Sequence, residues 1–357
     1  MANNSIQSWW SAESLARRRP YLDVRRAAVK AVRAYFQAEG FMEVETPAIQ
    51  VSPGVERHIR PFVTSLNDPL ASEDGAVRYL HTSPEFAMKK LMAGGMTKIV
   101  QLARVWRNGE RGPLHHPEFT MLEWYRADAD YNVLMTDCEA LLRGVMKAAE
   151  RTLQAGELLR WQGLTCDPAK AAERLTVQEA FARHSGIDLL ATVDDPAAYA
   201  PPPQKLAAAA KAQGLHVSDN DTWEDVFFRV MLERIEPKLG IDAPTILCAY
   251  PASLAALARR KPGEGRVAER FELYVCGVEL ANAYSELTDA VEQRARFAHD
   301  RALHAELYGN APPLDEDFLN AVGSLPPCAG AALGFDRLVM LASGATDITD
   351  VLWAPVV

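Results

Sequence analysis

The segment 118–126, EFTMLEWYR, places side chains of unlike chemistry at every second position. Successive side chains of a β-strand point to opposite faces of the sheet. One face of a strand here therefore carries Phe119, Met121, Glu123 and Tyr125. The aromatic ring can stack on a flat base, while the carboxylate and the phenol can hold an amine. Taken alone, the run is more simply explained by a solvated sheet face that mixes residue types.

Two acidic side chains flank a predicted hairpin in the segment 271–289, FELYVCGVELANAYSELTD. A two-residue turn at 276–277 pairs Val275 with Val278 and puts Glu272 and Glu279 on one face as diagonal neighbours, roughly 7–8 Å apart. Two such carboxylates repel each other unless a cation lies between them, and magnesium bridging a nucleotide suits that position. An exposed acidic hairpin is the alternative.

Glu286 follows on the same predicted strand. Strict alternation places Glu279 and Glu286 on opposite faces. If both serve one pocket, the strand must bulge between them, and we expect that bulge at 281–283.

A third group of residues lies near the end of the chain, in GAALGFDRLVML (330–341). We expect AGAALGFDR to form a turn that leads into a helix, with Arg337 at the helix start. An arginine there can reach phosphate oxygens. A surface pair between Asp336 and Arg337 explains this segment equally well.

The elements that would position these residues alternate irregularly along the chain. Hydrophobic periodicity and Gly or Pro boundaries predict helices at 21–39, 83–95, 132–155 and 223–239. Strands are expected in FMEVETP (41–47) and at 98–107, 118–127, 245–250 and 271–281. The Ala- and Pro-rich stretch 160–225 is expected to be a helical and loop insert. Because no regular strand–helix rhythm is present, we expect an α+β fold.

Composition narrows the class of protein. The 357 residues carry a net charge of −9, which argues against broad, sequence-independent nucleic-acid binding. Five scattered cysteines without a CxxC pair argue against zinc and suit a reducing compartment. No segment has the length and apolarity of a signal peptide or a membrane span. We therefore expect a cytoplasmic protein.

In their order, three segments resemble the three motifs of class II aminoacyl-tRNA synthetases: GFMEVETP, RNGERGPLHHPEFTMLEWYR and GAALGFDR. Two further segments, TSPEFAMKKLMAGG and VELANAYSELTD, are similar to the lysyl-tRNA synthetase subgroup. The resemblance runs from about residue 20 to the end and is weakest over 160–225. It implies a single catalytic domain over 1–357, an antiparallel sheet flanked by helices, and a homodimer built through the first motif.

Within that class, the chain resembles the elongation factor P–lysine ligase family. About 20 residues precede the predicted helix that leads into the first motif, too few for an anticodon-binding barrel. Ser83 stands where the synthetases usually have Ala, and Ala332 where they have Gly. The family attaches (R)-β-lysine to a lysine side chain of elongation factor P. The resemblance thus implies ATP and Mg²⁺ as cofactors, lysine or (R)-β-lysine as substrate, elongation factor P as partner, and no role for tRNA.

The resemblance also implies roles for individual residues. Arg107 and Arg337 are the catalytic arginines, on the α- and γ-phosphates. The other expected ATP-binding residues are Asn108, His115, His116, Phe119, Glu279, Leu280 and Gly334, and the magnesium carboxylates are Glu272 and Glu279. The expected amino-acid-binding residues are Ser83, Pro84, Glu85, Glu123, Tyr125, Asn282, Glu286 and Ala332, with Glu85 and Glu123 near the backbone-side amine and Tyr125 and Glu286 on the distal ammonium.

Two positions depart from the family pattern. Gly109 stands where the second motif usually has a glutamate, with Glu110 next to it, and His116 replaces a common Asn. Three other functions remain open: a truncated synthetase that charges tRNA, an amidating ligase of the asparagine-forming kind, and an inactive binding paralogue. Survival of the phosphate arginines and metal carboxylates argues against the last.

Overall fold

A long mixed sheet forms the centre of the computed structural model, which describes residues 8–54, 56, 58–67, 75–154 and 156–356. Within these residues the sheet has eight strands, whose spatial order is β1 (Met42–Glu43), β5 (Lys98–Trp106), β6 (Glu118–Ala127), β15 (Cys328–Gly334), β14 (Val278–Ser285), β13 (Arg270–Val275), β10 (Thr245–Cys248) and β9 (Glu173–Thr176). All neighbours from β5 to β10 are antiparallel, and the pairs at the two ends are parallel. The expected α+β class is confirmed.

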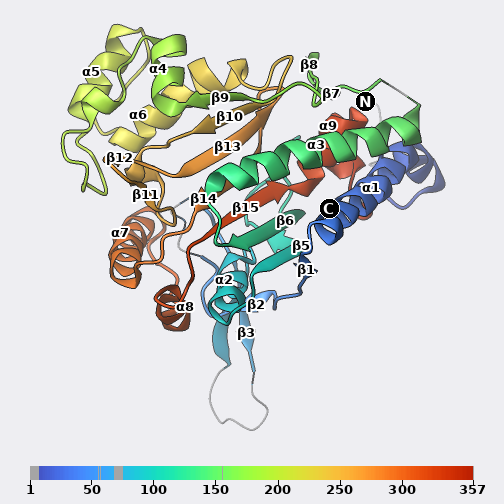
Figure 1. Cartoon of the computed structure of the whole chain (residues 1–357), viewed down its shortest axis with the longest axis horizontal. Helices are drawn as coiled ribbons and strands as arrows, with labels where there is room; N and C mark the ends of the chain where they lie inside the picture. The colour runs from blue at the N-terminus through green and yellow to red at the C-terminus, as the bar shows by residue number, and fades with distance from the viewer. Residues whose placement is uncertain (1–7, 55, 57, 68–74, 155, 357) are drawn as a thin grey trace, which may run out of the picture.

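Helices α1 (Ala12–Ala38), α3 (Tyr131–Leu153) and α9 (Phe335–Ser343) cover one face of this sheet (Figure 1). The predicted apolar stripe of α1 is buried there: Val24, Ala28, Val32 and Phe36. Asp137 of α3 ties the layers together, since it accepts hydrogen bonds from Tyr35 Oη at 2.6 Å and Trp124 Nε1 at 3.0 Å. Because this layer uses one face of β6, the other face is left for the candidate site.

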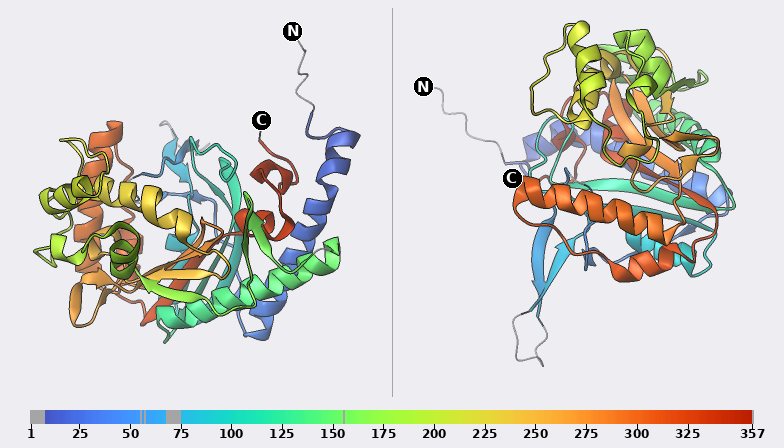
Figure 2. Two further views of the ribbon diagram at one scale, coloured as in Figure 1. Left: turned by 90° about the horizontal axis from the view of Figure 1, so that it is seen from above. Right: turned by 90° about the vertical axis from the view of Figure 1, so that its left-hand side faces the viewer.

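Two further groups of helices pack on the other face of the sheet, one against β5 and β6 and one against β9, β10 and β13 (Figures 1 and 2). Helices α2 (Glu85–Ala93), α7 (Ala290–Tyr308) and α8 (Glu316–Val322) share a core in which the rings of Phe86 and Phe318 stack 4.0 Å apart. Helices α4 (Val177–Ser185), α5 (Gln204–Ala212) and α6 (Trp223–Val230) share another, with Trp223 stacked on Phe227. A small sheet of β2 (Ile49–Gln50), β4 (Ala76–Leu80) and β3 (Phe62–Leu66) projects from the molecule.

Several predicted helix and strand bounds are corrected by the structure. Helix α1 begins at Ala12 rather than at residue 21, because Ser11 caps it and Pro20 is accommodated within it. The helix expected over 223–239 is regular only to Val230, and a π-helical turn (Met231–Ile235) and a 3₁₀ turn (Glu236–Lys238) follow. FMEVETP contributes only the two residues of β1, because Pro47 and the following loop leave the sheet.

The turn expected in AGAALGFDR is wrong, because 329–334 belong to β15, a strand between β6 and β14. The expected helix after it is confirmed, since α9 begins at Phe335 and has Arg337 in its first turn. Small side chains in β15 allow close packing inside a sheet. A Cβ at Gly330 would lie 2.2 Å from Cε1 of Tyr125, so only glycine fits beside that ring.

The β13–β14 hairpin has the predicted turn and register at its tip, with Val275 opposite Val278 and Tyr274 opposite Glu279. The predicted bulge exists but lies earlier than 281–283. Leu273 pairs with Ala281, which leaves Leu280 as the extra residue. The bulge returns later side chains of β14 to the face of Glu279, so Glu279, Asn282 and Tyr284 line one cavity.

The segment 160–225 is more than a helical and loop insert. It also contains the hairpin strand β8 (Leu164–Cys166), whose partner is β7 (Leu159–Trp161), and β9, which extends the central sheet. A separate two-stranded pair is formed by β11 (Arg260–Lys261) and β12 (Glu264–Ala268). None of the helices in the described ranges combines the length and the apolar character required to span a bilayer.

Candidate active site

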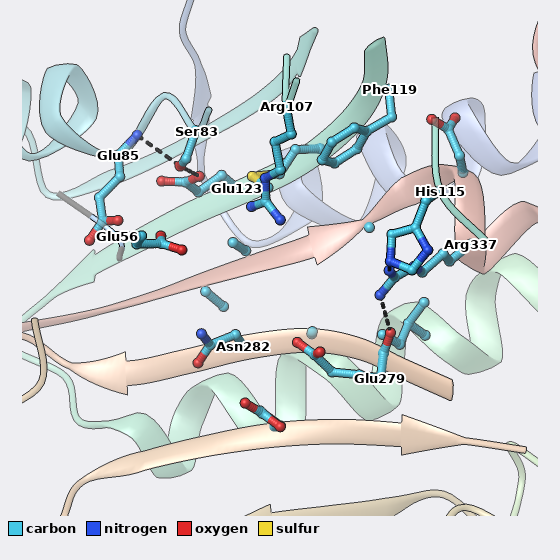
Figure 3. A pocket seen from close by; sticks show the side chains of 18 of the residues that line it. Glu56, Ser83, Glu85, Arg107, His115, Phe119, Glu123, Glu279, Asn282 and Arg337 are labelled. Atoms are coloured by element: carbon cyan, nitrogen blue, oxygen red, sulfur yellow. Dashed lines mark hydrogen bonds between the residues drawn. The ribbon is translucent and has the colours of Figure 1, made fainter. Parts of the chain in front are cut away.

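A cavity of about 330 Å³ lies on the sheet face opposite to α1 and α3. Strands β6, β13, β14 and β15 form its floor, and the start of α2, the loop 107–117 and the start of α9 form its walls (Figure 3). The predicted face of β6 points into it, whereas Thr120, Trp124 and Arg126 bond to the helical layer behind. The cavity therefore joins the second and third motif segments with residues of TSPEFAMKKLMAGG and VELANAYSELTD.

Most of the expected site residues line this one cavity: Ser83, Glu85, Arg107, His115, His116, Phe119, Glu123, Tyr125, Glu272, Glu279, Leu280, Asn282, Ala332, Gly334 and Arg337. Three do not line it. Pro84 precedes α2 and borders a smaller neighbouring cavity, and Asn108 uses its backbone N–H on the Arg60 carbonyl at 2.7 Å. Glu286 is buried behind Tyr125, beside Gly330 and against Lys89 of α2.

At one end of the cavity, Arg337 meets the loop of the second motif. Its Nη2 donates to Nε2 of His115 at 2.7 Å and its Nη1 donates to the Glu279 carbonyl at 2.9 Å. Burial, and then the charge of Arg337, lower the pKa of His115, which keeps the ring neutral and able to accept. Arg337 is thus a permanent positive charge held at the cavity wall.

Asp336 explains why Arg337 is held there. Its carboxylate accepts from the Thr120 backbone N–H at 2.7 Å and from the Arg25 guanidinium, and all three groups are buried. The start of α9 is therefore fixed to β6 and α1 at once. The surface-pair alternative for Asp336 and Arg337 is wrong, because Asp336 points into the core and away from Arg337's partners.

Arg107 lies over Phe119, with its guanidinium carbon 5.3 Å from the ring centroid. A purine between or beside these two groups would be held by stacking and by the cation. Glu110 lies 3.9 Å from Arg107. Gly109 has φ of 84°, a backbone conformation that disfavours glutamate, so the departure from the motif goes with a tighter loop.

His116 is engaged by the backbone. Its Nδ1 donates to the Glu118 carbonyl at 2.6 Å, and its Nε2 accepts from the Val356 N–H at 3.1 Å. The ring therefore connects the loop of the second motif to the last described residues of the chain. Its edge still borders the cavity.

Glu272 and Glu279 differ in their surroundings. Glu272 accepts from Arg270 at 2.6 Å and from the hydroxyls of Tyr250 and Tyr274. Among the described residues, no hydrogen bond or ion pair reaches the Glu279 carboxylate. Burial, and then the charge of Glu272, raise the pKa of Glu279 to about 7.

This pair fits a divalent cation shared with a nucleotide. Oxygen ligands suit magnesium, which takes one or two carboxylates and completes its shell with phosphate oxygens and water. No group of three or more His, Cys, Asp or Glu in the described ranges could hold a metal ion by itself. A cation at Glu279 would therefore depend on the phosphates for the rest of its shell.

The other end of the cavity carries buried carboxylates. Glu123 accepts from Ser83 Oγ and from Tyr125 Oη, both at 2.6 Å. Burial, and then the charge of Glu85, raise the pKa of Glu123 to about 8. An ammonium group placed beside Glu123 would stabilise the ionised carboxylate against the effect of burial, so this end of the cavity suits an amine.

Ala332 lies in register between Asn282 of β14 and Glu123 of β6. Its methyl group therefore borders the space between an amide and a carboxylate on the cavity floor. This is the position at which an extra methyl can shape the fit of a small ligand.

Four residues near the cavity are absent from the expected set: Glu56, Lys89, Arg270 and Tyr284. Lys89 had a signal in the sequence, because it lies four residues after Glu85 on a predicted helix and such pairs face each other. Arg270 and Tyr284 are positioned by the bulge of the β13–β14 hairpin, which the sequence analysis placed too late in β14. Glu56 belongs to a loop without a periodic pattern.

The comparisons with known proteins agree with this geometry. The family model described as tRNA synthetases class II (D, K and N) matches residues 11–357. Proteins of Salmonella dublin, Salmonella paratyphi B and Salmonella heidelberg, each named elongation factor P–(R)-β-lysine ligase, are 40% identical over 332 residues, which is 92% of this chain and 93% of theirs. The chain therefore belongs to the elongation factor P–(R)-β-lysine ligase family of class II synthetase-like enzymes.

Proposed function

We propose that this protein activates (R)-β-lysine with ATP as an adenylate and transfers it to a lysine side chain of elongation factor P. One observation carries the proposal: a single cavity has permanent arginine charges at one end and buried, proton-holding carboxylates at the other. The first end suits phosphates and the second suits the ammonium groups of a lysine isomer.

In the activation step, a carboxylate oxygen of the amino acid attacks the α-phosphorus of ATP and pyrophosphate leaves. Arg107 holds the α-phosphate and the incoming carboxylate, Arg337 holds the γ-phosphate, and Phe119 lies under the adenine with His115 beside it. Magnesium at Glu279, with Glu272 near it, would neutralise phosphate charge as pyrophosphate departs. Positioning and charge neutralisation thus account for the rate.

In the transfer step, the neutral amine of the acceptor lysine attacks the carbonyl carbon of the mixed anhydride. AMP leaves with the electron pair of the broken C–O bond, and the attacking nitrogen loses a proton as the amide forms. We assign Glu85 and Glu123 to the amine near the carboxylate of the amino acid, and Tyr125, Glu286 and Asn282 to the distal ammonium.

We further propose that the protein acts as a cytoplasmic homodimer that does not use tRNA. Large apolar side chains are exposed around the first motif and the projecting sheet: Met42, Ile49, Val51, Val63 and Val77. Val63 and Val77 lie on one face of the β3–β4 hairpin at diagonal positions, where a second copy can cover them. All five cysteines, each within the described ranges, are free thiols, as a reducing compartment requires. Light scattering on the purified protein would measure its mass in solution, and a mass of twice that of one chain would support the homodimer.

ATP–pyrophosphate exchange without tRNA tests the activation step. The exchange rate of the purified protein is measured with (R)-β-lysine, L-α-lysine, L-asparagine and L-aspartate in turn, and the four rates are compared. Exchange that is strongest with (R)-β-lysine supports the proposal, whereas preference for α-lysine favours a synthetase that charges tRNA. Exchange only with aspartate would favour the amidating ligase, and no exchange by folded protein would favour a binding paralogue.

A further inference from the structure

Lys89 of α2 is a fully enclosed lysine to which the family motifs assign no role. Its residue is 2% exposed. Its Nζ lies 2.5 Å from Oε1 of Glu85 and 2.5 Å from Oε2 of Glu286, and 5.2 Å from the ring centroid of Tyr284. A buried ammonium is unfavourable without such partners, so the two carboxylates and the lysine must be considered together.

Four carboxylates lie at this end of the cavity: Glu85, Glu123 and Glu286, with Glu56 beside Glu85 (Figure 3). Glu123 is bonded by the neutral hydroxyls of Ser83 and Tyr125. In the described part of the chain, Lys89 is the one cationic side chain that pairs with Glu85 or Glu286, and none pairs with Glu123. Lys89 therefore compensates only part of the negative charge that these carboxylates carry when they are ionised.

A lysine isomer brings two ammonium groups, which would compensate more of that negative charge. Lys89 itself does not line the cavity, whereas Glu85 does. Its effect on a ligand must therefore pass through the carboxylates that it holds, one from α2 and one from the segment that follows β14.

We propose that Lys89 is a positioning residue of the amino-acid pocket, where its buried ammonium holds Glu85 and Glu286 in place and offsets part of their negative charge, so that the ammonium groups of the substrate can offset the rest. This inference rests on the proposed activation of a lysine isomer. The pKa shifts of the buried groups agree with the proposed pairing of Lys89 with Glu85 and Glu286. Although burial opposes a charged lysine, Glu286 and Glu85 raise the pKa of Lys89, while burial raises the pKa of Glu286 to about 8 even with Lys89 beside it.

The test compares Lys89→Met with Lys90→Met in ATP–pyrophosphate exchange with (R)-β-lysine. Lys90 is the next residue of α2 and pairs with Asp315 and Asp317 at 2.9 Å, away from the cavity. Lys89→Met should raise KM for the amino acid by at least about tenfold while KM for ATP changes less than about twofold. Lys90→Met should change neither KM, although it can lower the melting temperature.

A pH series separates positioning from simple support of the fold. In Lys89→Met, Glu286 loses its cation and must give up a more tightly held proton before it accepts an ammonium. KM for the amino acid should therefore reach its minimum at higher pH than in the wild type. The double variant Lys89→Met/Glu286→Gln cannot titrate at position 286 and should not show that shift.

If Lys89→Met does not fold, the double variant carries the comparison, because it leaves no unpaired charge of that ion pair. An amino-acid KM in the double variant above that of Glu286→Gln alone, with an unchanged ATP KM, supports the proposal. An amino-acid KM equal to that of Glu286→Gln, or a parallel rise of both KM values, overturns it. Absence of exchange in the wild type would overturn the proposed function and this inference together, whereas wild-type exchange with unaffected variants overturns this inference alone.

Discussion

Arg337 and His115 are 222 residues apart in the sequence, yet Nη2 of the arginine donates to Nε2 of the histidine at 2.7 Å. This bond closes the phosphate end of the cavity between α9 and the loop of the second motif. Because the arginine cannot lose its charge, the histidine must stay neutral to accept. A nucleotide phosphate would offer Arg337 a stronger partner than the imidazole.

Arg337→Ala should lower kcat/KM for ATP in the exchange reaction by at least about a hundredfold, as loss of a charge-stabilising donor does in other active sites. Arg337→Lys should not restore it, because an ammonium cannot reproduce the planar fork. Arg294→Ala, which removes a surface pair with Glu316, is the matched control and should leave the rate unchanged. Equal loss in the control would attribute the effect to folding.

The Glu123 carboxyl should make stability depend on pH in the absence of substrate. Burial and Glu85 raise its pKa from 4.5 to about 8, so the folded protein keeps a proton that the unfolded chain releases above pH 4.5. This contribution to stability is present at low pH and is lost as the pH rises towards 8. The melting temperature of Glu123→Gln should therefore rise relative to that of the wild type as the pH increases over that range, and it should be higher by about 2–4 °C at pH 8. A constant difference from pH 5 to pH 8 would contradict this.

Glu279 and Glu272 should respond differently to loss of charge. Glu279→Gln should raise the magnesium concentration for half-maximal exchange by at least about tenfold while leaving stability equal or higher, because a buried like-charge repulsion is removed. Glu272→Gln should lower the melting temperature, because Arg270 loses its carboxylate partner. Magnesium titrations and thermal melts on both variants measure this, with Glu264→Gln, from an exposed pair with Arg266, as control. An unchanged magnesium requirement in Glu279→Gln would remove that residue from the metal site.

Ala332→Gly should weaken discrimination between (R)-β-lysine and L-α-lysine. The methyl group lies between Asn282 and Glu123, and one methyl in a tight pocket changes relative rates by about tenfold or more. The ratio of the two kcat/KM values in exchange assays should therefore shift towards α-lysine. If the ratio is the same in both proteins, Ala332 does not select the substrate.

The site was more predictable from sequence than the strands that carry it. The face of β6 and the turn of the β13–β14 hairpin follow from local alternation and turn chemistry, and both were predicted correctly. Strand β15 was mistaken for a turn because its small residues have low strand propensity. Its position is imposed by β6 and β14 on either side, a non-local effect.

Other features depend on packing that no local pattern encodes. The bulge at Leu280 is defined by the partner strand, and it brings Asn282 opposite Glu272, where Arg270 reaches the Asn282 side chain. Lys89 can be buried because the fold brings Glu286, about 200 positions away in the sequence, into an ion pair with it. Helix α1 continues through Pro20 because its other contacts with the sheet and α3 outweigh one missing hydrogen bond.

The most direct test of the proposed function is the intact mass of elongation factor P after incubation with this protein, ATP, magnesium and (R)-β-lysine. We expect the factor to gain the mass of a single lysyl group on one lysine side chain, and to gain nothing when Arg337→Ala replaces the wild-type protein or when ATP is omitted. An unmodified factor, together with lysine attached to tRNA in the parallel reaction, would contradict the proposal and identify the chain as a tRNA-charging enzyme.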